Sequence, residues 1–301
     1  MSEVNQRSAQ ALGARWRGWA DRLRLYCRLT RLDRPIGTLL LLWPTLTALW
    51  FAARGWPGGK LLAIFVAGTW LMRSAGCALN DVADRHFDAH VKRTAARVVA
   101  TGQVSIIEAL AVAAVLAAAA ALTLLWLNPI ARVTALAALA VTACYPFFKR
   151  FFALPQAVLG VAFSFGIPMA FAAVQGRLGA IAGWMLVANF FWVMAYDTEY
   201  AMVDRDDDVN LGLRSSAILF GRADVAMVAG CYAVYLAQIA LLAWGEGVGA
   251  GFAAGWIVAA GCAVYHVMLI RRRQRDACFH AFLHNQWLGL AIFAGTVAGF
   301  A

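Results

Sequence analysis

Charged residues are scarce in this chain. Asp, Glu, Lys and Arg make up 14% of its 301 residues, whereas soluble domains carry about 25%. Hydrophobic residues reach 62%, an excess too large for a water-soluble core. This composition predicts an all-α polytopic membrane protein. No stretch has the composition of a polar second domain, so we expect a single membrane domain over residues 35–301, after a short basic arm over residues 1–34.

Patterned cysteines and zinc-type histidines are also missing. The six cysteines are scattered, form no CxxC pair and mostly lie in apolar runs, so we expect neither a disulfide framework nor a zinc site. Two histidine pairs have i, i+4 spacing, His86/His90 and His280/His284, but no third ligand follows in a zinc pattern. We interpret them as surface or interfacial histidines. The arm has eight arginines but no apolar core followed by a cleavage site, which argues against a cleaved secretory signal.

Long apolar runs are abundant. Backbone groups in lipid must form hydrogen bonds within the protein, so such runs are expected to be helices. Nine runs are long enough, or nearly so, to cross a bilayer. They lie near residues 36–53, 61–79, 106–127, 130–147, 154–174, 180–199, 223–243, 249–270 and 283–301.

The net charge of +10 is distributed unevenly along the chain. Of the 26 Lys and Arg residues, 21 lie before the first apolar run or after even-numbered runs. The positive-inside rule then predicts a cytoplasmic N-terminus and accounts for the charge without a nucleic-acid partner. The arm has Trp16, Trp19, Leu23 and Tyr26 at helical spacing, which is typical of an amphipathic helix on an anionic membrane surface. A solvated arm explains this pattern equally well.

Nine of the 16 acidic residues fall in two short windows, each at the cytoplasmic end of an even-numbered run. In the first window, "NDVADRHFD", Asn80, Asp84 and Asp88 recur every four residues and form one helical stripe, with Asp81 beside it. The second window is "DTEYAMVDRDDD". One helix face there is predicted to carry Asp197, Tyr200, Ala201, Asp204 and Asp208, whereas Asp206 and Asp207 point elsewhere.

Like charges on one helix face repel, and each charge near lipid costs about 3 kcal/mol on insertion scales. Divalent cations relieve this cost most simply. Carboxylate and amide oxygens, completed by water, describe a Mg²⁺ site, and Mg²⁺ commonly shares its open positions with phosphate oxygens. Two such clusters predict two ions around one diphosphate. The alternative is that these are solvated acids at helix ends, paired with Arg85, Lys92 and Arg93.

Three cations are candidates for binding the diphosphate. Arg73 lies within an apolar run, seven residues before Asn80 and on the same stripe. Lys149 follows the fourth run and Arg34 precedes the first, both on the predicted cytoplasmic side. The alternatives are an ion pair with nearby acids for Arg73, and snorkelling to the interface for the other two.

The two windows resemble a known family. Asn80-Asp81-x-x-Asp84-x-x-x-Asp88 and Asp197-x-x-Tyr200-Ala201-x-x-Asp204-x-x-x-Asp208 are similar to the paired motifs of the UbiA-type intramembrane prenyltransferases. From about residue 25, the stretches "RLDRPIGTLLLLWPTLTALW", "YPFFKRFFALPQAVLG" and "SSAILFG" resemble its 4-hydroxybenzoate polyprenyltransferase branch. One stretch departs: "RVVATG" at Arg97–Gly102 stands where this branch has a proline-containing "RPLPSG"-like loop, so the loop's conformation is open.

The resemblance implies about nine transmembrane helices around a central cavity. It also implies Mg²⁺-dependent transfer of a polyprenyl group from its diphosphate to the ring carbon ortho to the hydroxyl of 4-hydroxybenzoate, with release of diphosphate. This is a step of ubiquinone biosynthesis in the bacterial inner membrane. The partners expected are these two substrates and the lipid bilayer, with no nucleic acid and no obligate protein partner.

The resemblance and the physics of the motifs assign expected roles. Asp84, Asp197, Asp204 and Arg73 are the expected catalytic residues, with Asp197 polarising the phenol. Tyr145 and Tyr200 are expected to shape the pocket for the allylic cation through their π faces. Arg34, Arg73 and Lys149 are expected to bind substrate, and Arg34 could instead hold the benzoate carboxylate. The expected metal ligands are Asn80, Asp81, Asp84, Asp88, Asp204 and Asp208.

Other functions fit parts of the pattern. Other members of the family use a naphthoate, a haem, a chlorophyllide or a homogentisate as acceptor. The alcohol phosphotransferases of phospholipid synthesis also use Asp clusters with Mg²⁺, but their DGxxAR-type motif is absent here. A divalent-cation carrier would place acids near the bilayer midplane, whereas both windows here lie toward one side.

Overall fold

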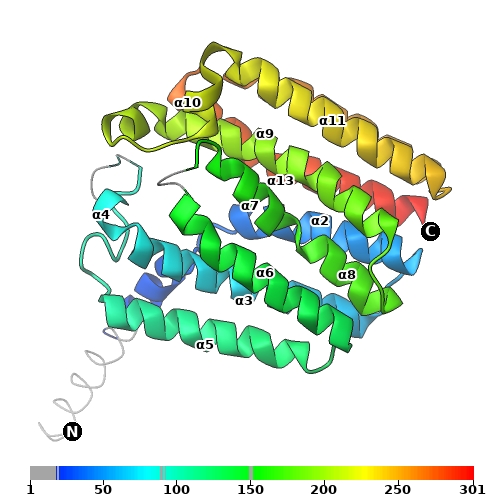
Figure 1. Cartoon of the computed structure of the whole chain (residues 1–301), viewed down its shortest axis with the longest axis horizontal. Coiled ribbons are helices and arrows are strands. Elements are labelled where there is room, and N and C mark those ends of the chain that lie inside the picture. Colours follow the sequence, from blue (N-terminus) through cyan, green and yellow to red (C-terminus); the bar gives the residue numbers. More distant parts are fainter. Residues whose placement is uncertain (1–17, 19, 89–90, 92, 149–151) are drawn as a thin grey trace, which may run out of the picture. The chain divides into compact units, whose positions relative to one another are not determined.

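The computed structural model describes residues 18, 20–88, 91, 93–148 and 152–301, except for the side chains of residues 87 and 145–148. This part of the chain is helical and contains no β-strand (Figure 1). The predicted all-α class is therefore confirmed. Several residues singled out in the sequence lie outside the described part, namely Trp16, Trp19, His90, Lys92 and Lys149.

Each of the nine apolar runs coincides with a helix, except that the fifth forms two consecutive helices. Within the described residues, seven helical segments are long and apolar enough to cross a membrane, so the count of nine is approximate. The α-helices are α2 (Ile36–Ala53), α3 (Gly59–Ala83), α4 (Arg85–Asp88), α5 (Ile106–Leu124), α6 (Pro129–Phe148), α7 (Pro155–Ser164), α8 (Gly166–Gln175), α9 (Ala180–Asn210), α10 (Ser216–Phe220), α11 (Asp224–Gly245), α12 (Ala250–Ile270) and α13 (Arg275–Gly299).

The chain divides into two compact units, and the division falls within α3 and α5. The first unit comprises Met1–Pro35 and Leu71–Ala119. Residues 20–29 of the arm are helical. Leu29 packs in an apolar cluster with residues from the end of α3, the following loop and α5. The remaining members of this cluster are Ala78, Val98, Val99, Val104, Ala109 and Ala113.

The loop that departs from the family pattern is anchored by this cluster. Val98 is 1% exposed and Val99 is 7% exposed. The loop also bonds to itself, since the Thr101 N–H donates to the Arg97 carbonyl over 2.9 Å. Gly102 adopts φ +73°, a conformation that favours glycine. Apolar burial and turn hydrogen bonds therefore order this loop without the stiffness of proline.

The second unit comprises Ile36–Trp70 and Ala120–Ala301. Within it, α9 packs against α7, α11 and α13 (Figure 1). Helix α13 also packs against α2 and α12. The α12–α13 contact is close because glycines meet there. A Cβ atom on Gly255 would lie 2.7 Å from the Gly295 Cα. Small residues of this kind allow membrane helices to approach backbone to backbone.

The fifth apolar run is split at Phe165, between α7 and α8. Pro168 explains the break, because proline has no N–H to donate to the Ser164 carbonyl four residues earlier. The Ser164 hydroxyl donates to the Gly160 carbonyl over 2.7 Å, and it accepts a hydrogen bond from Asn189 Nδ2 of α9 over 2.9 Å. The end of α7 is therefore tied to α9 by a buried side-chain hydrogen bond.

Helix α9 is longer than a bilayer crossing requires. Its 31 residues span about 46 Å, whereas the hydrocarbon layer is about 30 Å thick. The apolar first two-thirds of the helix suffice to cross this layer. The polar end, from Asp204 to Asn210, can therefore project beyond it.

Candidate functional site

The first acidic motif continues as a helical stripe across the α3–α4 junction. The Asp84 N–H donates to the Asn80 carbonyl over 2.9 Å, and the Asp88 N–H donates to the Asp84 carbonyl over 2.8 Å. Asn80, Asp84 and Asp88 thus stand on three successive turns, as their spacing predicts. Asn80 and Asp84 are half-buried.

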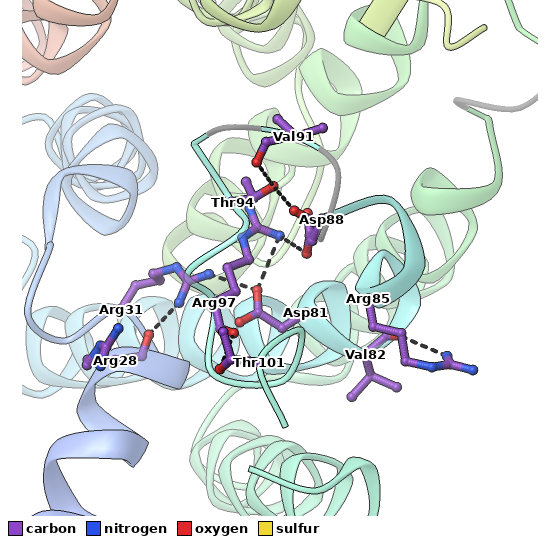
Figure 2. Close-up of polar contacts among 10 residues, drawn as sticks. All are labelled: Arg28, Arg31, Asp81, Val82, Arg85, Asp88, Val91, Thr94, Arg97 and Thr101. Atoms are coloured by element: carbon purple, nitrogen blue, oxygen red, sulfur yellow. Dashed lines mark hydrogen bonds and ion pairs between the residues drawn. The ribbon is translucent and has the colours of Figure 1, made fainter. Parts of the chain in front are cut away.

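Two arginines hold the other carboxylates of this motif (Figure 2). Arg31 Nη2 donates to Asp81 Oδ1 over 2.7 Å. Arg97 Nη1 lies 2.7 Å from Asp88 Oδ2 and 3.3 Å from Asp81 Oδ1, so it bridges the two acids. Figure 2 shows Arg85 extending away from this pair, toward the Val82 carbonyl. Arg31 and Arg97 therefore pair with acids of this motif, in addition to any pairing with the basic residues foreseen in the sequence.

Asp81 and Asp88 are both deeply buried. The side chain of Asp81 is 1% exposed and that of Asp88 is 8% exposed. Burial raises the pKa of the Asp88 carboxyl above its usual value, and the charge of Arg97 and its hydrogen bond oppose this rise. Oδ2 of Asp81 has no hydrogen-bond partner among the described residues.

The cations predicted for the diphosphate differ in their surroundings. Arg73 is half-buried on α3, two turns before Asn80, as its position in the sequence predicts. Arg34 is largely exposed, with 78% of its side chain accessible and Asp33 as its ion-pair partner at 3.9 Å. Lys149 lies outside the described residues. The same holds for the side chain of Tyr145, whose backbone belongs to α6.

The second acidic motif occupies about the last four turns of α9. Asp204 is buried, while Asp197 and Asp208 are half-buried. Arg275, at the start of α13, donates to Asp207 Oδ2 over 2.6 Å and lies 3.6 Å from Asp204 Oδ1. The Tyr200 ring packs against Phe282, with their centroids 4.4 Å apart. Asp206 is exposed, whereas Asp207 shares Arg275 with Asp204 and so lies beside the predicted face.

The donor set of the two motifs fits a hard divalent cation. Each motif offers oxygen ligands on successive helical turns, Asn80 with Asp84 and Asp204 with Asp208, and oxygen ligands are what Mg²⁺ prefers. Across the described ranges, no three His, Cys, Asp or Glu side chains are already grouped as a metal site. Partial donor sets of this kind leave coordination positions for substrate oxygens, as is typical of Mg²⁺ sites that bind phosphates.

Sequence reasoning missed Arg31 and Arg97 as partners of the first motif. Both lie in non-helical or irregular segments, where no periodicity indicates which way a side chain points. The only available signal was charge: Arg31 and Arg97 flank the motif on the predicted cytoplasmic side. That signal cannot distinguish them from the exposed Arg34.

The chain belongs to the UbiA prenyltransferase family, whose model matches residues 41–290. It is thus an integral membrane protein of the class that its helices and paired acidic motifs indicated, and the predicted family is confirmed.

Curated relatives define its place in the family more closely. The chain is 58% identical over 278 residues to the 4-hydroxybenzoate octaprenyltransferase of Herminiimonas arsenicoxydans. The aligned region covers 92% of this chain and 98% of that protein. It is 59% identical to the enzyme of the same name from Burkholderia vietnamiensis, and this alignment covers 92% of this chain and 96% of that protein.

Solved structures agree in fold. A UbiA homologue from Aeropyrum pernix K1, in its apo form, has a TM-score of 0.78 at 24% identity and covers 88% of this chain and 98% of its own. A UbiA homologue from Archaeoglobus fulgidus bound to GPP and Mg²⁺ has a TM-score of 0.66 at 15% identity and covers 91% and 99%. These similarities support the UbiA-like fold of the chain.

Proposed function

We propose that the chain is a 4-hydroxybenzoate polyprenyltransferase. It transfers a polyprenyl group from polyprenyl diphosphate to the ring carbon ortho to the hydroxyl of 4-hydroxybenzoate, and it releases diphosphate, in ubiquinone biosynthesis. The observation that carries this proposal is the 58% identity to enzymes of that name over 92% of the chain, a span that includes both acidic motifs. Because those relatives are octaprenyltransferases, octaprenyl diphosphate is the first donor to test.

In this proposal the two motifs bind the diphosphate through metal ions. Asn80 and Asp84 supply oxygens from the first motif, and Asp204 and Asp208 supply them from the second. Bound Mg²⁺ would neutralise the charge that develops on the diphosphate as it leaves. Asp81 and Asp88 were also predicted as ligands, but each already binds an arginine through one carboxylate oxygen, so only the other oxygen could coordinate a metal while these ion pairs stay intact.

The remaining roles concern the organic substrates. Arg73, Lys149 and Arg34 neutralise the diphosphate oxygens, since arginine and lysine stabilise developing negative charge on a phosphoryl group. Asp197 accepts a hydrogen bond from the phenol of the acceptor and so increases the electron density of its ring. The proposed role of Tyr200 and Tyr145 is to shape the pocket for the allylic cation, which an aromatic π face attracts. The proposed reaction also requires an apolar environment that excludes water, which would otherwise capture this cation.

The proposed location is the bacterial inner membrane, with the N-terminus and both acidic motifs on the cytoplasmic side. The support for this orientation is the 21 of 26 basic residues predicted to lie on that side. A soluble aromatic acid and a membrane-bound polyprenyl diphosphate can both reach that interface. No obligate protein partner is part of the proposal.

The test is a product assay on membranes that contain the protein, with Mg²⁺, prenyl diphosphates of several lengths and a panel of aromatic acceptors. Prenylated 4-hydroxybenzoate formed by the wild type, and lost in both Asp84→Ala and Asp204→Ala, supports the proposal. A product with another acceptor alone keeps the chemistry and overturns the proposed substrate. No prenylated product with any acceptor overturns the enzyme function.

A further inference from the structure

A buried polar network lies on the side of α9 away from the acidic motif. Glu199 is 0% exposed, and its two carboxyl oxygens contact α11 and α13. Oε1 lies 2.9 Å from the Tyr232 hydroxyl, and Oε2 accepts a hydrogen bond from Asn285 Nδ2 over 2.8 Å. No cation pairs with Glu199 in the part of the chain that the structure describes, which is costly for an ionised carboxylate away from water.

The orientation of the Asn285 amide is fixed by its neighbours. Its Nδ2 donates both protons, one to Glu199 and one to the Ala281 carbonyl over 3.0 Å. Its Oδ1 accepts a hydrogen bond from Trp192 Nε1 over 2.9 Å, and an indole nitrogen can only donate. Asn285 Oδ1 is therefore an acceptor in all of its contacts.

The Tyr232 hydroxyl has three polar neighbours and only one proton. It lies 2.9 Å from Glu199 Oε1, 2.9 Å from Asn285 Oδ1 and 3.0 Å from His266 Nδ1. If Glu199 were ionised, its oxygen and Asn285 Oδ1 would compete for that proton, and one oxygen–oxygen contact would lack a hydrogen. If Glu199 is protonated, it donates to Tyr232, and Tyr232 donates to Asn285.

His266 and His284 extend this assignment of hydrogen-bond donors and acceptors. His266 Nδ1–H donates to the second lone pair of Tyr232, which leaves His266 Nε2 as an acceptor. His266 Nε2 lies 2.9 Å from His284 Nδ1, which then carries the donated proton. When Glu199, Tyr232, His266 and His284 are all uncharged, each hydrogen-bond contact among them and with Asn285 Oδ1 contains one hydrogen. The hydrogen-bond count thus favours a neutral network that links α9, α11, α12 and α13.

This network fixes how α9 is rotated. Trp192 and Glu199 are two turns apart on one face of α9, and Asn285 bonds to both. At 3.6 residues per turn, Asp197, Asp204 and Asp208 lie roughly 140–180° around the helix from Glu199. A rotation of α9 that moved these three carboxylates would break the bonds of Glu199 and Trp192 with Asn285.

We infer that Glu199 is a protonated positioning residue, which holds the second acidic motif in its binding direction through Tyr232 and Asn285. This inference deepens the proposed function, since it rests on the second motif binding metal and diphosphate. It predicts that glutamine can replace Glu199, because the glutamine amide can donate to Tyr232 and accept from Asn285 as a protonated carboxyl does. Alanine cannot make either bond.

The protonation state has a direct measurement that needs no turnover. The infrared difference spectrum of wild type minus Glu199→Gln, recorded at neutral pH in detergent without substrate, is expected to contain the carbonyl band of a protonated carboxylic acid. A difference spectrum with carboxylate bands instead would overturn the neutral state. Asp81 and the other acids are present in both proteins, so they cancel.

The positioning role is tested with Mg²⁺ and inorganic diphosphate as the probe. We expect this pair to raise the melting temperature of wild type and Glu199→Gln equally, and to raise that of Glu199→Ala only at Mg²⁺ concentrations about tenfold higher. In the prenyl transfer assay, Glu199→Ala should show the same increase in the KM for Mg²⁺, and Glu199→Gln should restore the wild-type value. Tyr232→Phe, which removes the shared hydroxyl, should resemble Glu199→Ala.

Two results would overturn the role. Equal Mg²⁺ dependence of wild type and Glu199→Ala would show that Glu199 does not position the motif. Equal impairment of Glu199→Gln and Glu199→Ala would show that an anion is required. If the wild type neither shifts with the probe nor forms a prenylated product, the proposed function and the positioning role both fail, while the infrared band still decides the charge of Glu199.

Discussion

Arg97 donates a hydrogen bond to Asp88 across 2.7 Å, and in doing so it ties the loop before α5 to the end of the first acidic motif. The same guanidinium nitrogen lies 3.3 Å from Asp81. One arginine thus serves two carboxylates that are almost inaccessible to water. The ion pairs also connect this loop with the motif, independently of the apolar contacts of Val98 and Val99.

Removing the Arg97 charge should destabilise the protein. In Arg97→Gln, two buried carboxylates lose a cationic partner, and breaking a buried pair in this way costs about 3 kcal/mol. We expect a melting temperature several degrees lower in detergent, measured by tryptophan fluorescence. Arg24→Gln is the matched control because its side chain is 81% exposed, and it should melt as the wild type does. Equal melting of the two variants would contradict a stabilising role for Arg97.

The raised pKa of Asp88 predicts a pH dependence of stability. Because burial raises this pKa in the folded state, the folded protein binds more protons than the unfolded chain between the ordinary value of about 3.9 and the raised value. The contribution of Asp88 to stability therefore falls as pH rises through this window. Relative to Asp88→Asn, the wild type should gain stability as the pH is lowered from neutral toward about 4. Melting curves of both proteins without Mg²⁺, taken at several pH values, check this; a constant difference would refute it.

The second motif offers an internal comparison between neighbouring acids. Asp204 is buried on the predicted binding face, whereas Asp206 is exposed and points away from it. Asp204→Asn should lower kcat/KM for prenyl transfer by about 100-fold or more, since a metal ligand supplies several kcal/mol of charge stabilisation. Asp206→Asn should leave it nearly unchanged. Similar losses in both variants would indicate a general need for negative charge rather than a metal-binding face.

The predicted orientation can be checked by cysteine labelling. Arg272 lies in the loop before α13, on the predicted cytoplasmic side, and Arg177 lies between α8 and α9, on the opposite side. In a background with the native cysteines replaced by serine, a membrane-impermeant maleimide should label Arg272→Cys only in inside-out vesicles. It should label Arg177→Cys only in right-side-out vesicles. Labelling of both sites from one side would contradict the positive-inside assignment.

The helices and the two motif stripes could be predicted because they depend on local periodicity. Apolar runs long enough to cross a bilayer located the helices within a few residues, and four-residue spacing placed Asn80, Asp84 and Asp88 on one stripe. The break at Phe165 was missed because the run stays apolar throughout. Pro168 was its only local signal, and proline does not always interrupt a membrane helix.

Partners from distant segments could not be predicted, because they depend on how helices and loops pack. Tyr232 and His266 stand within apolar runs, Asn285 stands between His284 and Gln286, and nothing in their spacing relates them to Glu199. Histidines were interpreted as surface or interfacial. This suits the exposed His280, whereas His284 is half-buried and bonds to the fully buried His266. Arg31 and Arg97 were missed for the same reason.

The length of α9 has a consequence for how reactants arrive. Because the helix is longer than the hydrocarbon layer is thick, its last acidic residues can reach the level where the bilayer meets water. For the proposed reaction, the aromatic acid can dock from solution without crossing lipid, and the polyprenyl tail can stay dissolved among the acyl chains. A single helix that reaches from the hydrocarbon layer to the interface would thereby allow a water-soluble acceptor and a lipid-soluble donor to meet, while each remains in the phase that dissolves it.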